Sequence, residues 1–169
     1  MRTLLAITFT FILNISFGQD LDKRKIAIDA EVERISEQST VGTVNFSIQT
    51  LKKVLNYISY QYRESSKGYV KISRQFSHKN DTIHQDFYLK DGSLIYAHEI
   101  ITSYFTNNGK TDSIGWSGGF YFAKGKLIDC ITHGHGKSEM DSWNPEKDML
   151  TAFEESKKDI TRYKKKKKT

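Results

Sequence analysis

The sequence predicts an α+β fold: an antiparallel β-meander of about five strands, with helices before it and one helix after it packed on one face. Two observations support this prediction. From Gly68 to His133, apolar and polar residues alternate through five short segments that are separated by residues favouring turns. On both sides of this region, apolar residues instead recur at the three- and four-residue spacing of amphipathic helices.

Turn residues set the expected strand registers. Asp91-Gly92 suits a two-residue type I′ turn, which needs positive φ at both central positions. This loop predicts the following pairs on one face: Leu89 with Leu94, Phe87 with Tyr96, Gln85 with His98 and Ile83 with Ile100. We expect that face to be the core. The opposite face, with His84 against Glu99, is then expected to meet water.

Further turns are expected at Asn80-Asp81, within 107–110 and at Lys124-Gly125. A three-residue loop within 107–110 keeps the apolar side chains of the next strand on the core side, whereas a change of one loop residue reverses them. Gly118-Gly119 in that strand is typical of a β-bulge. The predicted pairs are Arg74 with Phe87, Phe122 with Leu127, Phe120 with Asp129 and Trp116 with His133.

The first 18 residues are typical of a secretory signal peptide. Arg2 supplies a positive charge, an apolar run follows from Leu4 to Phe17, and small residues precede an expected cleavage before Gln19. A membrane anchor is the alternative, but the run is shorter and more polar than a span of about 20 apolar residues. We therefore predict an exported protein, periplasmic or secreted, with no transmembrane span after cleavage.

Removal of 18 of the 169 residues leaves 151, enough for one domain with its own core. The single cysteine, Cys130, excludes an internal disulfide. The net charge of +6 falls to +5 without Arg2, and residues 157–169 contribute +7 because they hold eight Lys or Arg against one Asp. The rest of the mature chain is therefore near −2, which argues against a nucleic-acid groove across the domain.

Helical spacing flanks the meander. Ile28, Val32 and Ile35 predict a helix over Lys23–Gln38, with Asp20 or Asp22 as its cap. An extended piece over Val41–Ile48 follows. A second helix is expected behind Thr50 from Leu51, Val54, Leu55 and Ile58, although tyrosines at 57, 60 and 62 leave its end open between helix and strand. After the meander, Asn144 and Pro145 predict the start of a helix whose apolar stripe comprises Met149, Leu150, Phe153, Ile160 and Tyr163.

The expected registers bring polar residues together among aromatic ones on the core face. This candidate ligand-binding pocket comprises Arg74, Gln85, Tyr96, His98, Trp116, Phe120 and Asp129. Within it, His98 and Asp129 could form an oriented acid/base pair. The alternative interpretation is a satisfied polar layer beneath a covering helix. No catalytic nucleophile is placed by the sequence.

Cys130, His133 and His135 are the candidate metal ligands, because thiolate and imidazole bind zinc and copper. Residues 130 and 133 of one strand point to opposite faces, so only His133 and His135 can converge readily. Two ligands do not make a tight site, and the alternative is a small buried cysteine beside two histidines at a loop. The sequence implies no cofactor.

Two segments, Phe87–Ile95 and Phe120–Ile128, share the order aromatic strand, glycine turn, strand. These hairpins resemble those of small exported bacterial α+β proteins and of PepSY-like domains. The resemblance covers the meander and the last helix and implies an α+β fold. It brings no catalytic residues with it.

We therefore expect an exported, non-enzymatic binding or structural module that holds a protein or small-molecule ligand on its sheet face or aromatic hairpins. One alternative is a small hydrolase or metal-dependent enzyme around His98, Asp129 and His133. Another is attachment to an anionic surface through the last lysines, Lys164, Lys165, Lys166, Lys167 and Lys168. The expected organisation is a signal peptide over 1–18, one α+β domain over 19–163 and a solvated lysine tail over 164–169.

Overall fold

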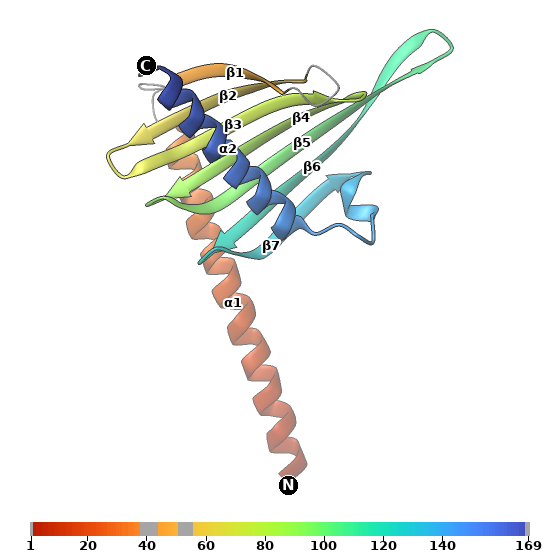
Figure 1. Ribbon diagram of the computed structural model, residues 1–169. Coiled ribbons are helices and arrows are strands. Elements are labelled where there is room, and N and C mark those ends of the chain that lie inside the picture. Colours follow the sequence, from red (N-terminus) through yellow and green to blue (C-terminus); the bar gives the residue numbers. More distant parts are fainter. Residues whose placement is uncertain (1, 38–43, 51–55, 168–169) are drawn as a thin grey trace. The chain divides into compact units, whose positions relative to one another are not determined.

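The computed structural model describes residues 2–37, 44–50 and 56–167 of the chain (Figure 1). The chain forms two compact units. The first, Met1–Glu37, contains helix α1 (Arg2–Glu37). The second, Gln38–Thr169, contains a seven-stranded antiparallel sheet and the C-terminal helix α2 (Pro145–Lys167). The predicted α+β class is therefore confirmed.

The strands follow one another in the sheet in chain order, as expected for a meander. They are β1 (Val44–Thr50), β2 (Asn56–Ser65), β3 (Gly68–His78), β4 (Asp81–Lys90), β5 (Ser93–Asn107), β6 (Lys110–Ala123) and β7 (Lys126–Gly134). The short 3-10 helix η1 (Lys137–Glu139) lies between β7 and α2. The five predicted strands correspond to β3–β7, and the sheet gains two more at its N-terminal edge.

Strand β2 occupies the last part of the second helix expected from the sequence. Residues 51–55 lie outside the described part, but Ile58, Tyr60 and Tyr62 belong to a strand. Their alternation places them on one face, where the Tyr60 ring stacks on Phe46 of β1 with 5.1 Å between ring centroids. The end of this segment, which the sequence leaves open between helix and strand, is therefore a strand, because aromatic packing across two strands outweighs the weak helical spacing.

Helix α1 is continuous over residues 2–37, so the helix expected from Lys23 does not begin with a cap at Asp20 or Asp22. Asp20 instead forms an ion pair with Arg24 one turn later, with 2.7 Å between the charged atoms. None of the helices in the described residues combines the length and the apolar character that crossing a membrane requires.

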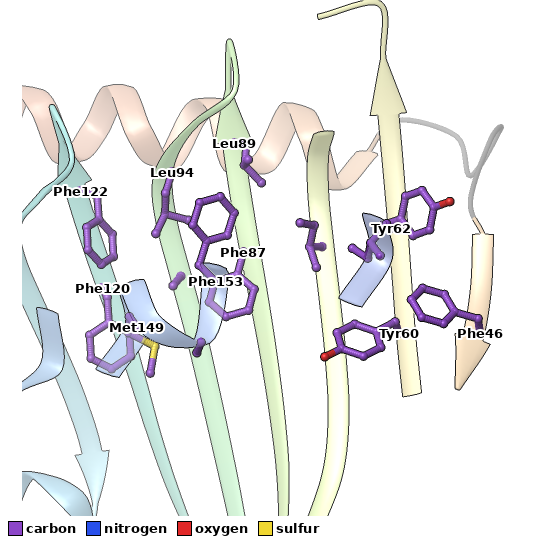
Figure 2. Packing of buried hydrophobic residues seen from close by; sticks show 14 of the residues in the cluster. Phe46, Tyr60, Tyr62, Phe87, Leu89, Leu94, Phe120, Phe122, Met149 and Phe153 are labelled. Carbon is purple, nitrogen blue, oxygen red and sulfur yellow. The ribbon is translucent and has the colours of Figure 1, made fainter. Parts of the chain in front are cut away.

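One face of the sheet, here called the inner face, packs against α2, and the other is called the outer face. The inner face of β1–β6 contributes Phe46, Tyr60, Tyr62, Ile72, Phe87, Leu89, Leu94, Ala97, Trp116, Phe120 and Phe122 to the core, and α2 contributes Met149, Ala152, Phe153 and Ile160. Figure 2 shows how most of these side chains pack. The predicted apolar stripe of α2 is thus confirmed. The predicted cap is also present: the Lys147 N–H donates to Asn144 Oδ1 at 2.9 Å.

A β-bulge changes the register between β4 and β5. Leu89 pairs with Leu94 as predicted, but the register then shifts, so Tyr88 rather than Phe87 faces Tyr96. From there on, Tyr96, His98 and Ile100 point to the outer face, whereas Ala97, Glu99 and Ile101 point to the inner face. The prediction for this half of β5 is wrong because one extra residue reverses every side chain that follows.

The Lys124-Gly125 turn and the pairing of Phe122 with Leu127 are confirmed, whereas the other two turns differ from the prediction by single residues. The β3–β4 turn is Lys79-Asn80, so Arg74 faces Gln85 instead of Phe87. The β5–β6 turn has two residues, Asn108 and Gly109, both with positive φ. Because this shorter loop and the β4–β5 bulge each reverse the faces once, Trp116 and Phe120 still reach the predicted inner face.

Gly118 and Gly119 form no bulge, because β6 keeps a continuous register there with both neighbours. The shift lies at Tyr121/Phe122 on the β7 side, so Phe120 faces Cys130 and Trp116 faces Gly134, not the predicted Asp129 and His133. The glycines instead make room for rings. A Cβ at Gly118 would lie 2.7 Å from Phe120 Cζ.

Helix α2 continues past Lys164, where a solvated tail is predicted, and runs through Lys167. The Lys164 ammonium pairs with Glu64 and lies 5.0 Å and 4.9 Å from the ring centroids of Tyr62 and Tyr69. The first of the terminal lysines is therefore part of the packing between α2 and the β2–β3 hairpin. Lys168 lies outside the described residues.

Candidate binding site

The seven residues of the predicted pocket do not share one face of the sheet. Arg74, Gln85, Trp116 and Phe120 lie on the inner face, whereas Tyr96, His98 and Asp129 lie on the outer face. The bulge between β4 and β5 and the one between β6 and β7, which no residue in the sequence marks, account for the difference. The single pocket expected from the sequence is therefore not formed.

A chain of buried polar side chains crosses the inner face. Arg74 Nε donates to Gln85 Oε1 at 2.5 Å, and Gln85 Nε2 donates to Glu99 Oε1 at 2.6 Å. Lys137 of η1 completes the chain, with its Nζ 2.9 Å from both carboxylate oxygens of Glu99. Glu99 is only 1% exposed, so its charge is balanced within the fold by Lys137.

This polar chain corresponds to the satisfied layer that the sequence offers as its alternative. At its other end, Arg74 Nη1 donates to Glu155 Oε2 of α2 at 3.3 Å. Each member therefore has partners among its neighbours. Sequence reasoning missed Glu99, because the bulge places it inside, and Lys137, because a connector after β7 carries no periodic signal.

The outer face carries a second polar cluster, centred on Asp86. Ser73 Oγ donates to Asp86 Oδ1 at 2.5 Å, His84 Nε2 lies 3.2 Å from the same oxygen, and Lys71 Nζ lies 3.3 Å from Oδ2. Burial raises the pKa of Asp86, but the hydrogen bonds of His84 and Ser73 and the charge of Lys71 outweigh it and lower the pKa to about 2.

The Asp86 cluster does not have the arrangement of a serine nucleophile hydrogen-bonded to a histidine base. The hydroxyl of Ser73 donates to a carboxylate and not to an imidazole, so nothing in this arrangement draws the proton from the oxygen toward a histidine. His84 was expected to face Glu99, but it pairs across the strands with Ile100 and bonds to Asp86 on its own strand. The Asp86 contact raises the pKa of His84.

The enzyme alternative placed His98, Asp129 and His133 together. All three lie on the outer face, but β6 separates His98 on β5 from the other two on β7. Two strand spacings amount to about 10 Å, which is beyond hydrogen-bond reach. Burial lowers the pKa of His98, and Asp129 Oδ1 accepts the Cys130 N–H at 2.9 Å.

The candidate metal ligands also stay apart. Cys130 lies on the inner face, where burial raises the pKa of its thiol. His133 points from the outer face, and His135 Nδ1 lies 2.6 Å from Glu139 Oε1. Among the residues that the structure describes, no three His, Cys, Asp or Glu side chains are grouped so that they could hold a metal ion.

A feature that sequence reasoning missed is an arm formed by the β5–β6 hairpin, here defined as residues 104–115. In the described sheet, Ser103 is the last β5 residue paired with β4, and Trp116 is the β6 residue paired with the end of β7. Beyond them the two strands pair with each other and extend past the rest of the sheet (Figure 1). Tyr104, Phe105 and Ile114 on the arm are each 46–47% exposed.

A pocket of about 330 Å³ lies where the arm leaves the sheet. It is bounded on one side by the β3–β4 turn and on the other by β5, where Tyr104, Phe105 and Thr106 line it. The Tyr104 N–H donates to the carbonyl oxygen of Asn80 at 3.0 Å and ties the arm to that turn. The exposed aromatic pair at Tyr104-Phe105 was the one sequence signal that could have located this site.

Comparisons with protein-family models, with curated proteins and with solved structures found no match to this chain.

Proposed function

We propose that this chain is an exported, non-enzymatic binding module that holds an extended segment of another polypeptide on the β5 edge of the arm. The observation that carries the proposal is the Tyr104 N–H to Asn80 hydrogen bond at the border of a pocket, because it identifies which backbone groups face that edge. The ligand would add a strand beside β5 and continue the sheet past the β3–β4 turn.

The alternation of an antiparallel ladder gives the orientation of the neighbouring groups. Asn107 and Lys110 flank the two-residue turn and form a pair that exchanges hydrogen bonds. Pairs of this kind alternate with pairs that do not, so the backbone groups of Thr106 and Thr111 point outward to opposite edges. Thr106 faces the same edge as Tyr104, and that edge borders the pocket.

The arm also exposes apolar surface that a bound peptide would cover. A two-stranded ribbon is marginally stable in water by itself, and this one carries three half-exposed apolar side chains. Phe105 and Ile114 extend the inner face outward from the buried Trp116. Covering each of them would contribute about 1 kcal/mol, in addition to the hydrogen bonds of an added strand.

Proline substitutions test this proposal without breaking the arm. Thr106→Pro removes an outward N–H at the β5 edge, and Thr111→Pro is the matched control, because it removes an outward N–H at the opposite edge. Peptides selected from a random library displayed on phage serve as the probe. We expect selected peptides to bind Thr106→Pro about five- to tenfold more weakly, the value of one lost hydrogen bond, and to bind Thr111→Pro as they bind the unmodified protein.

The proposal would be abandoned if the library yielded no peptide above background, or if both proline variants bound the selected peptides equally well. Far-ultraviolet circular dichroism of the two variants verifies that each remains folded. Export is tested separately by the N-terminal sequence of the protein recovered from outside the cytoplasm.

A further inference from the structure

The outward side of α2 carries a row of basic side chains near its C-terminal end. Lys158, Arg162 and Lys165 are exposed and follow one another at four- and three-residue spacing, so they form a single stripe over two helical turns. The buried residues of α2, such as Phe153 and Ile160, lie on the opposite side against the sheet. The stripe therefore points away from the domain.

This stripe borders a shallow pocket of about 470 Å³. Lys157, Lys158, Arg162 and Lys165 line it together with Glu154 and with Tyr69 of β3. Four cationic groups against one carboxylate leave the pocket strongly positive. Lys157 Nζ is 2.6 Å from Glu154, and Arg162 Nη1 is 3.3 Å from Asp159, so both cations are held in place beside the pocket by exchangeable surface pairs.

The charge of this region exceeds that of the pocket itself. Residues 157–167 of α2 hold seven Lys or Arg and one Asp, a net charge of +6. Lys164 forms an ion pair with Glu64 and contacts the rings of Tyr62 and Tyr69, and these contacts hold the end of the helix on the sheet. The other cations of the segment are thereby presented on a rigid ridge.

We infer that this ridge docks the protein on the anionic headgroups of a membrane surface, with one headgroup phosphate in the pocket beside Tyr69. Charge complementarity identifies the partner as anionic. The form of the ridge indicates that the partner is an extended surface, because a helix that lies flat on a sheet presents its cations along a line. A tyrosine beside these cations suits the membrane interface, where aromatic rings are enriched. The inference does not depend on peptide binding by the arm.

Co-sedimentation with lipid vesicles tests this inference on the full chain. Vesicles of phosphatidylcholine alone measure any apolar binding, and vesicles that also contain phosphatidylglycerol measure the anionic contribution above it. The variant Lys158→Gln/Arg162→Gln/Lys165→Gln removes three cations of the stripe. Because each cation near an anionic surface contributes about fivefold in affinity, we expect the anionic contribution to fall on the order of 100-fold in the triple variant.

A matched control removes the same charge elsewhere. Lys124→Gln/Lys126→Gln/Lys147→Gln neutralises three exposed lysines around the β6–β7 turn and the start of α2, and it should retain binding within about threefold of the unmodified protein. Raising the salt to about 500 mM should abolish the anionic contribution in all cases.

Three results would overturn the inference. The two triple variants could lose binding equally, which would mean that net charge alone matters. Glycerol phosphate at constant ionic strength could release the protein from the vesicles, which would identify a free phosphate compound as the ligand. Finally, a DNA oligonucleotide could bind as tightly as the anionic vesicles and with the same loss in the stripe variant, which would identify a nucleic acid as the partner.

Discussion

Removal of the Lys137 charge should destabilise the fold more than removal of the Glu99 charge that it balances. Glu99 is 1% exposed, whereas the Lys137 side chain is 29% exposed, and its Nζ contacts both oxygens of the carboxylate at 2.9 Å. In Lys137→Met the carboxylate stays buried with Gln85 as its remaining donor. In Glu99→Gln, by contrast, the lysine can turn toward water.

The difference in burial between Glu99 and Lys137 sets the expected losses of unfolding free energy. Leaving one partner of a buried ion pair uncompensated costs 3–5 kcal/mol in general, and the partial exposure of this site places Lys137→Met near the lower end, at about 3 kcal/mol of unfolding free energy. Glu99→Gln loses a charge-assisted contact but strands no charge, so about 1 kcal/mol is expected. The double variant should be close to Glu99→Gln alone, which gives a coupling energy of about 3 kcal/mol.

Urea unfolding followed by tryptophan fluorescence measures all three variants, and Lys126→Met on the exposed surface of β7 is the control, with a change within about 0.5 kcal/mol. The reasoning is refuted if Lys137→Met costs less than Glu99→Gln, or if the two single losses add in the double variant. Either result would mean that water, not Lys137, balances the Glu99 charge.

Four further predictions concern packing, titration and export. Gly118→Ala should cost about 1–3 kcal/mol of unfolding free energy, because its Cβ would lie 2.7 Å from a core phenylalanine ring. Gly115→Ala on the same strand is the control: its Cβ meets no atom within 4 Å, so it should be neutral or slightly stabilising. Similar values for both variants in urea unfolding would contradict this. The lowered pKa of Asp86, about 2 against an ordinary 3.8, gives stability that is present above pH ~4 and lost as the pH falls toward 2. Between pH 5 and pH 2, the unfolding free energy of Asp86→Asn should therefore fall by about 2 kcal/mol less than that of the unmodified protein. An unchanged pH profile would show that the carboxylate contributes nothing to this dependence. His84 has the opposite sign: its pKa is raised, so its contribution to stability is present below pH ~6.5 and declines as the pH rises through the raised value. His84→Gln should abolish this decline in a titration that is extended above pH ~6.5. The mature protein recovered outside the cytoplasm should begin at Gln19, as Edman sequencing would report, and recovery of an intact Met1 would exclude cleavage.

Local chemistry explains which parts of the fold were predictable. The five strands β3–β7 and the start of α2 are marked by residues close together in sequence, such as Asp91-Gly92 at a turn and Asn144 at a helix cap. Trp116 and Phe120 reach the inner face as predicted although the β4–β5 and β5–β6 registers, each of which reverses the faces, were predicted wrongly. Their faces were assigned by the requirement to bury large rings, and that requirement holds whichever loop length satisfies it.

The candidate site was less predictable because it depends on bulges and on contacts between distant residues. The β4–β5 bulge exchanges His98 for Glu99 on the inner face, and nothing in the local sequence distinguishes the two registers. The partner of Glu99 is 38 residues away on a connector. Predicting the arm requires knowing where β4 and β7 stop pairing with their neighbours. That point is set by the strand lengths across the sheet and not by any one segment.

The two proposed surfaces should act independently, because they lie at different places on one sheet. The C-terminal part of α2 packs over β1 and β2, where the Tyr163 ring stacks on Phe46 at 4.1 Å, whereas the arm arises from β5 and β6. The two pockets lie at opposite ends of β3, one at Tyr69 and the other at Ser77 and the β3–β4 turn. Eight residues of a strand span about 26 Å, so a docked membrane and a bound peptide need not compete. Thr106→Pro should thus leave vesicle binding unchanged, and the stripe variant should leave peptide affinity unchanged. If either substitution weakened both activities by more than about threefold, a change in the common sheet would explain both losses, and neither surface could be assigned its ligand.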